Sequence, residues 1–319
     1  ATKMTLLAAG AVLAVSPAMA QSVGLGTAKQ GAYTYSAGAA IAKVASDNGL
    51  SMRIQPFAGT SAYVPVVNKG ELQFGLANQL ETLYAFKGEA IYKGKPNPNL
   101  RVVAIMVPFR GAFFVKKDSP IKTIADLKGK RIPAQFTSAK ILVTLINGTL
   151  ANGGLSYKDA TGVPVTSVPS NADAFVRGKT DAFFFAVGSG KVSETAAKVG
   201  GLRALPFNTD AKSVAAMQKY VPVSYIENLK PRKGLAGFDV ATDVMAYDYL
   251  VLANAKVADE TVYKLAKAMH GNKKALMENF RPLAGFNPDR MSKEMSPLQF
   301  HPGAIKFYTE IKQWPPKKG

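Results

Sequence analysis

Small and polar residues follow three successive predicted strands in the first third of the chain, each time just before a predicted helix. They lie in the glycine-rich stretch 22–32, in 58–61 and at Asn78-Gln79. Unpaired backbone N–H groups converge at a helix N-terminus and can bind anions or polar groups there. Ligands of open α/β sheets also bind at the carboxyl ends of the strands. The repeated pattern therefore predicts a cradle for a small polar or anionic ligand.

The glycine-rich stretch is not a dinucleotide site. Gly24 and Gly26 fit the first half of the G-x-G-x-x-G fingerprint, but the third position is Lys29 and the next glycine is Gly31. Nucleotide binding is therefore disfavoured. A tight turn that requires glycine is the alternative explanation of this stretch.

Arg110 is a second candidate for ligand chemistry. It lies between two predicted apolar strands, 100–107 and 112–116, where a solvated charge is awkward. Its guanidinium can bind a carboxylate by two parallel hydrogen bonds. Pairing with an Asp or Glu of the chain, or exposure at a loop, explains Arg110 equally well, and the sequence leaves both interpretations open.

The elements that must position these residues follow one plan, in which a strand, a polar loop and a helix succeed one another. The plan starts again after the segment 118–131, where Pro120 ends a strand, Thr123 can cap a short helix and Gly129 fits its left-handed end. We expect strands at 52–57, 71–77, 100–107, 131–134, 165–168, 179–186 and 202–207, and helices at 33–50, 62–69, 80–86, 139–152, 191–199, 213–220 and 260–271.

Two extended runs, 112–116 and 239–253, are placed to pass from one part of the chain to the other and back. The predicted organisation is a first lobe of residues 21–112 and 246–319 (lobe I) and a second lobe of residues 113–245 (lobe II). A length of 319 residues suits two domains of ordinary size.

Composition excludes several classes of site. The chain has no cysteine, so it has no disulfide and no thiolate metal site. His270 and His301 are far apart and fit no metal-ligand spacing, and we predict neither a metal nor a cofactor. The net charge of +19 comes from scattered lysines, without a nucleic-acid-binding motif, so nucleic acid is not expected as a partner. The charge either keeps the protein soluble or steers anionic solutes toward it.

Residues 1–20 predict a cleaved secretory signal. Lys3 precedes an apolar core at 6–15, and Pro17 and Ala18-Met19-Ala20 follow in the order of a cleavage site. The apolar core is too short to span a bilayer. We therefore expect an exported protein, soluble in the periplasm of a Gram-negative bacterium.

Five segments give the chain a resemblance to the TAXI-family solute-binding proteins of tripartite ATP-independent periplasmic (TRAP) transporters, and the last of them is the most specific. They are GLGTAKQGAYTYSAGAAIAK at 24–43, FGLANQ at 74–79, ADLKGKRI at 125–132, TVYKL at 261–265 and HPGAIKFYTE at 301–310. The chain departs from the family pattern where Thr34 separates Tyr33 from Tyr35, where Phe136 stands in a usually glycine-rich loop, and around 188–190, which lacks a proline. These departures imply a changed pocket.

The resemblance implies a two-lobed α/β periplasmic binding protein, type II-like, in which each lobe is a mixed sheet flanked by helices and hinge strands cross between the lobes. Such a protein closes on a small organic solute and delivers it to a TRAP permease; it is expected to be a monomer and not an enzyme. With Arg110, the implied ligand is a carboxylate: an amino acid such as glutamate, a dicarboxylate or a 2-oxoacid. The implied binding residues are Thr27, Tyr35, Thr60, Ser61, Asn78 and Gln79 from lobe I and Phe136, Thr137, Ser138, Phe185 and Ser189 from lobe II.

Three alternatives remain at this stage. A binding protein of an ATP-dependent (ABC) importer has a similar two-lobed structure. A periplasmic sensor module binds ligands in the same way without a permease. A periplasmic enzyme is disfavoured, because no Ser/His/Asp set, carboxylate pair or metal cluster is evident, although scattered residues can converge in a fold.

Overall fold

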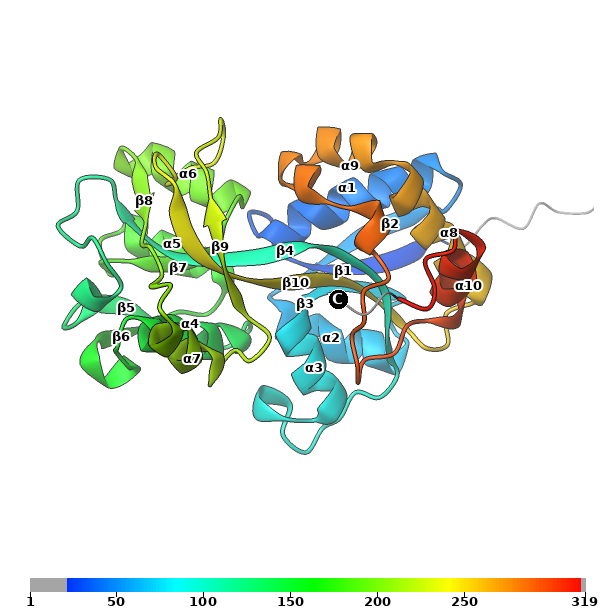
Figure 1. Ribbon diagram of the computed structural model, residues 1–319, viewed down its shortest axis with the longest axis horizontal. Helices are drawn as coiled ribbons and strands as arrows, with labels where there is room; N and C mark the ends of the chain where they lie inside the picture. Colours follow the sequence, from blue (N-terminus) through cyan, green and yellow to red (C-terminus); the bar gives the residue numbers. More distant parts are fainter. Residues whose placement is uncertain (1–21, 317–319) are drawn as a thin grey trace, which may run out of the picture.

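The computed structural model describes residues 22–316 and shows two lobes side by side (Figure 1). The predicted two-lobed α/β fold with crossing strands is thus confirmed. The predicted signal segment 1–20 and the basic pair Lys317-Lys318 lie outside the described residues. Within 22–316, no helix combines the length and the apolar character needed to cross a membrane.

Strands β4 (Leu100–Lys116) and β10 (Thr242–Asn254) are antiparallel partners that run from one lobe into the other. At about 3.3 Å per residue, the 17 residues of β4 cover roughly 55 Å. The expected interruption at 108–111 is wrong, because β4 is continuous. Pro108 lies opposite Asp248 at a register shift of the ladder, and such an irregularity tolerates a residue without an N–H.

One mixed sheet extends through both lobes, in the order β2-β1-β3-β10-β4-β7. Its first strands are β2 (Met52–Phe57), β1 (Val23–Ala28) and β3 (Phe74–Asn78), and β1 is parallel to both of its neighbours. In lobe II, β7 (Phe183–Ala186) and β8 (Leu202–Ala204) pair with β4, and β9 (Tyr225–Leu229) pairs with β10. Strand β9 has no counterpart among the sequence predictions.

A second, two-stranded parallel sheet in lobe II consists of β5 (Arg131–Ala134) and β6 (Thr161–Pro164). The lobe limits at 112 and 245 fall inside the continuous strands β4 and β10, so the residue at which one lobe ends stays a prediction.

Helices cover both lobes. Those of lobe I are α1 (Tyr33–Asp47), α2 (Thr60–Lys69), α3 (Gln79–Lys87), α8 (Asp259–Gly271), α9 (Lys273–Asn279) and α10 (Pro302–Glu310). Those of lobe II are α4 (Ile141–Asn152), α5 (Val168–Val176), α6 (Gly190–Val199) and α7 (Ala211–Gln218).

The segment that opens lobe II differs from its prediction. The expected helix is a single 3-10 turn, η2 (Ala125–Leu127). No side chain caps this turn, so the cap expected from Thr123 is wrong. Instead, Asp126 Oδ2 accepts hydrogen bonds from the backbone N–H groups of Lys122 and Thr123, both at 2.8 Å. An aspartate side chain that accepts hydrogen bonds from the backbone of residues just before its own turn favours a tight loop over a longer helix.

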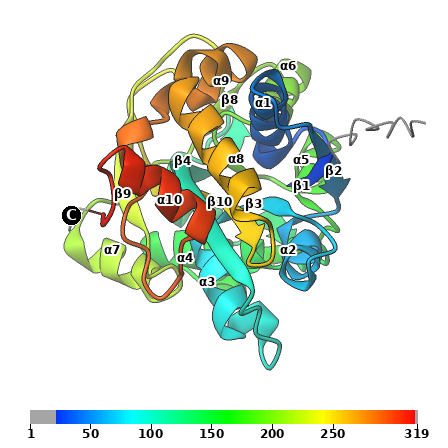
Figure 2. The ribbon, with the colours of Figure 1, turned by 90° about the vertical axis from the view of Figure 1, so that its right-hand side faces the viewer.

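The C-terminal segment secures the end of lobe I, where α10 packs across α8 (Figure 2). His301 is fully buried, and its Nδ1 accepts the hydrogen bond of the Gly303 N–H at 3.2 Å, which caps α10. Burial lowers the pKa of His301, which keeps the ring neutral at neutral pH. His301 is therefore a structural residue of this helix junction.

Candidate functional site

A cavity of about 60 Å³ lies between the lobes and is lined from both sides. A water molecule needs roughly 10–15 Å³ by the same measure, so the space holds a few waters or a small organic molecule. Lobe I contributes Ala28, Ala32, Tyr33, Thr34, Thr60, Asn78, Phe109 and Tyr249, and lobe II contributes Ala139, Ile141, Leu142, Leu145, Val168, Phe185 and Ala186. None of these lining side chains carries a charge.

Helix N-termini provide the polar character of the lobe I wall. Helix α1 starts after Ala32 and helix α2 after Gly59, and neither of these residues offers a side-chain cap. The first N–H groups of an α-helix have no partner within the helix, and the helix dipole makes this end positive. The starts of α1 and α2 therefore offer backbone donors beside the cavity, next to the lining residues Tyr33 and Thr60.

The lobes touch at the rim of the cavity. The Lys191 N–H of lobe II donates to the carbonyl oxygen of Gly31 in lobe I at 3.1 Å. The Ser138 hydroxyl oxygen lies 3.3 Å from the carbonyl oxygen of Ala58 in lobe I, while its one proton has a shorter acceptor at 2.6 Å, the Thr166 carbonyl oxygen. Gly59 packs so closely that a Cβ atom there would clash with the carbonyl oxygen of Ser138. The structure is thus a closed arrangement of the two lobes.

Aromatic rings form one end of the cavity. Tyr33 stacks on Tyr249 with ring centroids 5.1 Å apart, and Phe280 meets the edge of Tyr33 at 5.1 Å. Phe109 contacts Tyr249 edge-on at 5.4 Å. Burial raises the pKa of Tyr33 and of Tyr249, so both phenols are neutral at neutral pH. The wall is rigid, aromatic and uncharged.

A buried carboxylate that sequence reasoning missed supports the lobe I wall. Glu81, in the first turn of α3, has no exposed surface. Its Oε1 accepts hydrogen bonds from the Ser61 hydroxyl at 2.7 Å and the Tyr92 hydroxyl at 2.9 Å, and its Oε2 accepts from the Thr60 hydroxyl. Burial raises the pKa of Glu81, and these three hydroxyl donors oppose the rise. The available signal was the spacing Asn78-x-x-Glu81, which is typical of a helix start.

Three of the predicted residues, Thr60, Asn78 and Phe185, line the cavity. Asn78 also caps α3, because its Oδ1 accepts from the Glu81 N–H at 2.8 Å. Ser61 belongs to the hydrogen-bond network of Glu81, and Ser138 lies at the contact between the lobes.

The remaining predicted residues are not among those that line the cavity. Thr27 is fully buried and donates to the carbonyl oxygen of Ala28 at 3.0 Å. Phe136 belongs to the hydrophobic core, and Ser189 is buried and donates to the carbonyl oxygen of Ala186 at 2.7 Å. The exposed Thr137 donates to the carbonyl oxygen of Thr166 at 3.2 Å.

Two further predicted residues, Tyr35 in α1 and Gln79 in α3, are partly exposed in the first turns of their helices. Tyr33, two positions earlier, is the tyrosine of this segment that lines the cavity. The sequence motif therefore indicated the right turn of α1 but not the residue that faces inward.

Arg110 has a partner within the chain. Its Nε and one terminal nitrogen donate to the two carboxylate oxygens of Glu227 in β9, at 2.8 and 2.6 Å. The neighbouring Phe109 lines the cavity, and successive side chains of a strand point to opposite faces. The structure therefore has the paired arginine that the sequence left open. The positive charge of Arg110 still acts on the cavity-lining Tyr33, whose pKa it lowers against the larger effect of burial.

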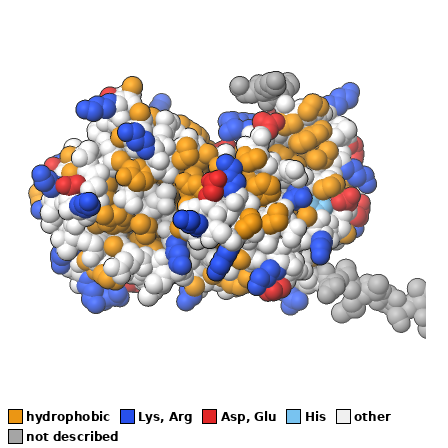
Figure 3. All heavy atoms as spheres, turned by 90° about the horizontal axis from the view of Figure 1, so that it is seen from below, with side chains coloured by type: hydrophobic (Ala, Val, Ile, Leu, Met, Phe, Trp, Pro, Cys, Tyr) orange, Lys and Arg blue, Asp and Glu red, His pale blue; other side chains and the backbone are white. Residues whose placement is uncertain are grey.

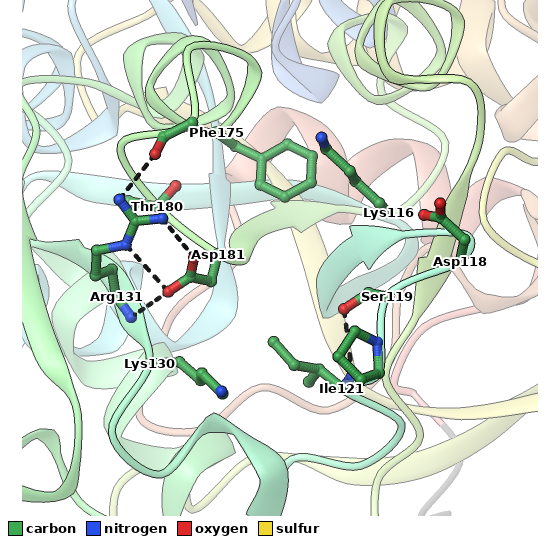
Figure 4. Close-up of a pocket in the computed structure, with 11 residues that line it drawn as sticks. Lys116, Asp118, Ser119, Ile121, Lys130, Arg131, Phe175, Thr180 and Asp181 are labelled. Carbon is green, nitrogen blue, oxygen red and sulfur yellow. Dashed lines mark hydrogen bonds and ion pairs between the residues drawn. The ribbon is translucent and has the colours of Figure 1, made fainter.

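Larger hollows lie elsewhere on the surface. One of about 450 Å³, at the far end of lobe II, is lined by Arg131, Asp181 and the loop 116–121 (Figure 4). The Arg131 guanidinium donates there to Asp181 at 2.6 and 3.2 Å and to the Gly178 carbonyl oxygen at 2.9 Å. This hollow is open and is lined by lobe II alone, whereas the cavity between the lobes is enclosed from both sides and is the better candidate site.

The surface charge is dispersed. On the face shown in Figure 3, Lys and Arg side chains are spread over both lobes and interleaved with apolar and neutral side chains. Among residues 22–316, no group of three or more His, Cys, Asp or Glu side chains could hold a metal ion.

The sequence matches the model of the NMT1-like family over residues 25–311, so the chain belongs to that family. Three solved structures show how widely its fold occurs. The alkanesulfonate-binding protein SsuA from Xanthomonas axonopodis pv. citri, bound to MOPS, is 19% identical, with a TM-score of 0.50, and the match covers 91% of this chain and 90% of that one.

PhnD1 from Prochlorococcus marinus (MIT 9301), in complex with methylphosphonate, is 12% identical with a TM-score of 0.56, over 92% of this chain and 98% of that one. The amino acid ABC transporter substrate-binding protein AbpA from Streptococcus pneumoniae Canada MDR_19A, bound to L-arginine, is 12% identical with a TM-score of 0.51, over 82% and 94%. At these identities the likeness shows a shared fold. None of the three is described as a TRAP protein, so the TAXI resemblance stays a prediction.

Proposed function

We propose that this protein is a periplasmic solute-binding protein of an ABC importer that captures a small organic anion between its lobes. The observation that carries the proposal is the cavity, which is enclosed by both lobes, uncharged, and bordered by the uncapped starts of α1 and α2. A ligand that contacts both lobes stabilises their closed arrangement, with β4 and β10 as the hinge.

The solute in this proposal carries one negative charge. Its acid group binds the backbone N–H groups at the start of α1, and its apolar part packs against Leu142, Leu145 and Phe185. A second charge, as in a dicarboxylate or a zwitterionic amino acid, would be buried against neutral walls without a partner, which is costly. Within the carboxylates expected from the sequence, the cavity therefore favours small monoacids, and sulfonates or phosphonates of similar size are further candidates.

The ABC assignment rests on the fold neighbours, which are described as binding a sulfonate buffer, a phosphonate and an amino acid, the last for an ABC transporter. Delivery to a TRAP permease is the second candidate, favoured by the sequence segments that resemble the TAXI family. Uptake into membrane vesicles separates the two, because ATP hydrolysis drives an ABC importer and an ion gradient drives a TRAP transporter.

Export belongs to the same proposal. The segment 1–20 would be removed on secretion, and the protein isolated from a periplasmic fraction would begin at Gln21. N-terminal sequencing of that protein tests the cleavage, and an intact segment 1–20 would contradict it.

A thermal-shift screen of residues 21–319 tests the ligand class. The panel contains acetate, propionate, lactate, pyruvate, methanesulfonate and methylphosphonate, with glutamate, succinate and glucose as contrasts. A ligand that binds only the folded protein adds about 2.7 kcal/mol of stability at a hundredfold excess over its dissociation constant. We expect the strongest shift from a small monoanion. A shift from glucose alone would contradict the ligand class, and no shift at all would contradict the proposed function.

A further inference from the structure

The Glu81 carboxylate lies directly behind the polar wall of the cavity. It is bonded to Thr60, which lines the cavity, and to Ser61, the next residue of α2. The third hydroxyl donor, Tyr92, comes from the 3-10 turn η1 (Ala90–Tyr92). Three hydroxyl protons thus converge on one buried carboxylate.

The surroundings of Glu81 contain titratable phenols. Tyr63 of α2, Tyr92 of η1, and Tyr247 and Tyr249 of β10 are the neighbours whose pKa values are raised by its negative charge, in addition to burial. Among the ion pairs of residues 22–316, none involves Glu81. The carboxylate oxygens therefore accept from three hydroxyl groups, at the positive start of α3, and a hydroxyl that turned away would leave an oxygen short of a donor.

This arrangement fixes the polarity of Thr60. A threonine hydroxyl has one proton to donate and two lone pairs that accept. Because the Thr60 proton is donated to Glu81 Oε2, only the lone pairs remain for a solute in the cavity. A solute that places an N–H or O–H group at Thr60 gains a hydrogen bond there. A solute that places a carbonyl oxygen there gains none, because the lone pairs of the carbonyl oxygen and of the Thr60 hydroxyl repel each other.

We propose that Glu81 is a positioning residue that sets solute specificity, because it makes Thr60 a hydrogen-bond acceptor and so selects small 2-hydroxy acids over the corresponding 2-oxo acids. The inference rests on the proposed function, since it concerns the same cavity. In this arrangement the acid group lies at the start of α1 and the hydroxyl group at Thr60. Glu81 does not itself touch the solute; it acts through Thr60.

The variant Glu81→Gln inverts the polarity of Thr60. Oε1 accepts from two hydroxyls, so the amide oxygen of glutamine is best placed there, facing Ser61 and Tyr92. The amide NH2 then faces Thr60 and donates to it. The Thr60 proton becomes available to the cavity, where it can bind a carbonyl oxygen.

The test compares three monoanions of nearly equal size that differ at C2. L-lactate has a hydroxyl group that can donate a hydrogen bond there, pyruvate has a carbonyl oxygen that can only accept one, and propionate has neither. The experiment is calorimetric titration of each into wild-type protein and into Glu81→Gln at pH 7.5. A site that binds a hydroxyl group discriminates strongly against analogues that leave its polar group unpaired. We expect wild-type protein to bind lactate at least about tenfold more tightly than pyruvate, and we expect Glu81→Gln to reduce that ratio to about twofold or to reverse it.

Two further variants control the test. Glu71→Gln removes an exposed glutamate of the same lobe and should leave the lactate-to-pyruvate ratio unchanged. Thr60→Val keeps the shape of the side chain without its hydroxyl and should bring the affinities for lactate and propionate together. Thr60→Val also replaces Glu81→Gln if that variant does not fold.

The outcomes separate the two proposals. Binding of all three acids with equal affinity by wild-type protein overturns the role of Glu81 and leaves the solute-binding function in place. An unchanged lactate preference in Glu81→Gln or in Thr60→Val overturns it as well. Absence of binding by all three acids contradicts the monoacid ligand class and this inference together, while binding of other solutes in the wider panel would keep the solute-binding function.

Discussion

The two walls of the cavity differ in chemistry. The lobe I wall contains Thr34, Thr60 and Asn78, together with uncapped helix starts and the buried Glu81 behind them. The lobe II wall is apolar and consists mainly of Ile141, Leu142, Leu145, Val168 and Phe185. Under the proposed function, this difference divides the work between the lobes: lobe I would recognise the polar group of the solute, and lobe II would cover its apolar part when the lobes close.

This division follows from how each wall is stabilised. Polar groups in lobe I hold one another in place through the hydrogen bonds of Glu81 and Asn78, so they are oriented before a solute arrives. The apolar side chains of the lobe II wall already belong to the hydrophobic core, and burial of the apolar surface that they present to the cavity favours closure of the lobes. Substitutions in lobe II should therefore affect stability and cavity size, whereas substitutions in lobe I should affect selectivity.

The largest effect is expected from Leu145→Ala in lobe II. Leu145 is fully buried and lines the cavity, so its truncation removes apolar contacts and enlarges the space. A Leu→Ala change in a core costs about 2–5 kcal/mol of unfolding free energy. Urea denaturation measures the loss, and the variant should also accept longer monoacids than wild-type protein. A loss below about 1 kcal/mol would show that the lobe II wall is not packed as described.

Gly59→Ala should prevent closure without disturbing either lobe. The backbone of Gly59 is extended, with φ 176°, a conformation that any residue can adopt. Its new Cβ atom would clash with the Ser138 carbonyl oxygen only when the lobes are closed. We expect solute affinity to fall by about a hundredfold, close to 2.7 kcal/mol, with little change in unfolding free energy. The control is Gly271→Ala, where a Cβ atom meets no neighbour within 4 Å.

Arg110→Ala distinguishes an ion pair from a ligand anchor. The Arg110 and Glu227 side chains are 17% and 27% exposed, so removal of the arginine leaves a mostly buried carboxylate without its partner. We expect a loss of about 2 kcal/mol of unfolding free energy and less than a threefold change in solute affinity. The paired variant Glu227→Gln shows how much of the loss comes from the stranded carboxylate. A large loss of affinity in Arg110→Ala alone would restore its role as the carboxylate anchor.

The pH dependence of stability reports on Glu81. Burial raises its pKa, so the folded protein binds this proton more tightly than the unfolded chain does. The stabilisation is fully present below the ordinary glutamate pKa and is lost as the pH rises through the raised value. The unfolding free energy of wild-type protein relative to Glu81→Gln should therefore fall with rising pH, by at most about 1.4 kcal/mol per pH unit. A constant difference would show that the pKa of Glu81 is the same in both states.

The smallest effect is expected at the edge of the contact between the lobes. The Tyr84 hydroxyl of lobe I donates to the carbonyl oxygen of Tyr220 in lobe II at 3.4 Å and is exposed. A long, solvated hydrogen bond contributes little, so Tyr84→Phe should change solute affinity by less than about twofold. A tenfold loss would mean that closure depends on this rim and not on the cavity walls.

The sequence was sufficient for the parts of the site that depend on local order. Polar residues at strand ends predicted Thr60 and Asn78 as ligand-binding residues; both line the cavity, and their role in binding stays a prediction. The prediction named Tyr35, but Tyr33, two positions earlier, lines the cavity. Which of the two tyrosines faces inward depends on the rotation of α1 about its axis, and the neighbouring elements determine that rotation. Phe185 and Phe136 are equally buried, and only the tertiary packing separates the cavity wall from the core.

The features of the candidate site that the sequence did not predict depend on contacts between residues far apart in the chain. Glu227 lies 117 residues from Arg110 and belongs to β9, a strand that no sequence pattern indicated, so the pairing could not be anticipated. Glu81 was overlooked because a glutamate in the first turn of a helix is usually solvated. Its burial depends on Tyr92, which a 3-10 turn brings back over α3. In both cases the information lies in contacts between distant segments.

The most direct test of the account combines affinity with shape. The solute with the strongest thermal shift is titrated into wild-type protein and into Gly59→Ala, and small-angle X-ray scattering measures the radius of gyration with and without it. We expect one solute per chain, a smaller radius in the complex of the wild-type protein, and about a hundredfold weaker binding without contraction in Gly59→Ala. Equal affinity of the two proteins, or binding without any contraction, would show that the solute is not held between the closed lobes.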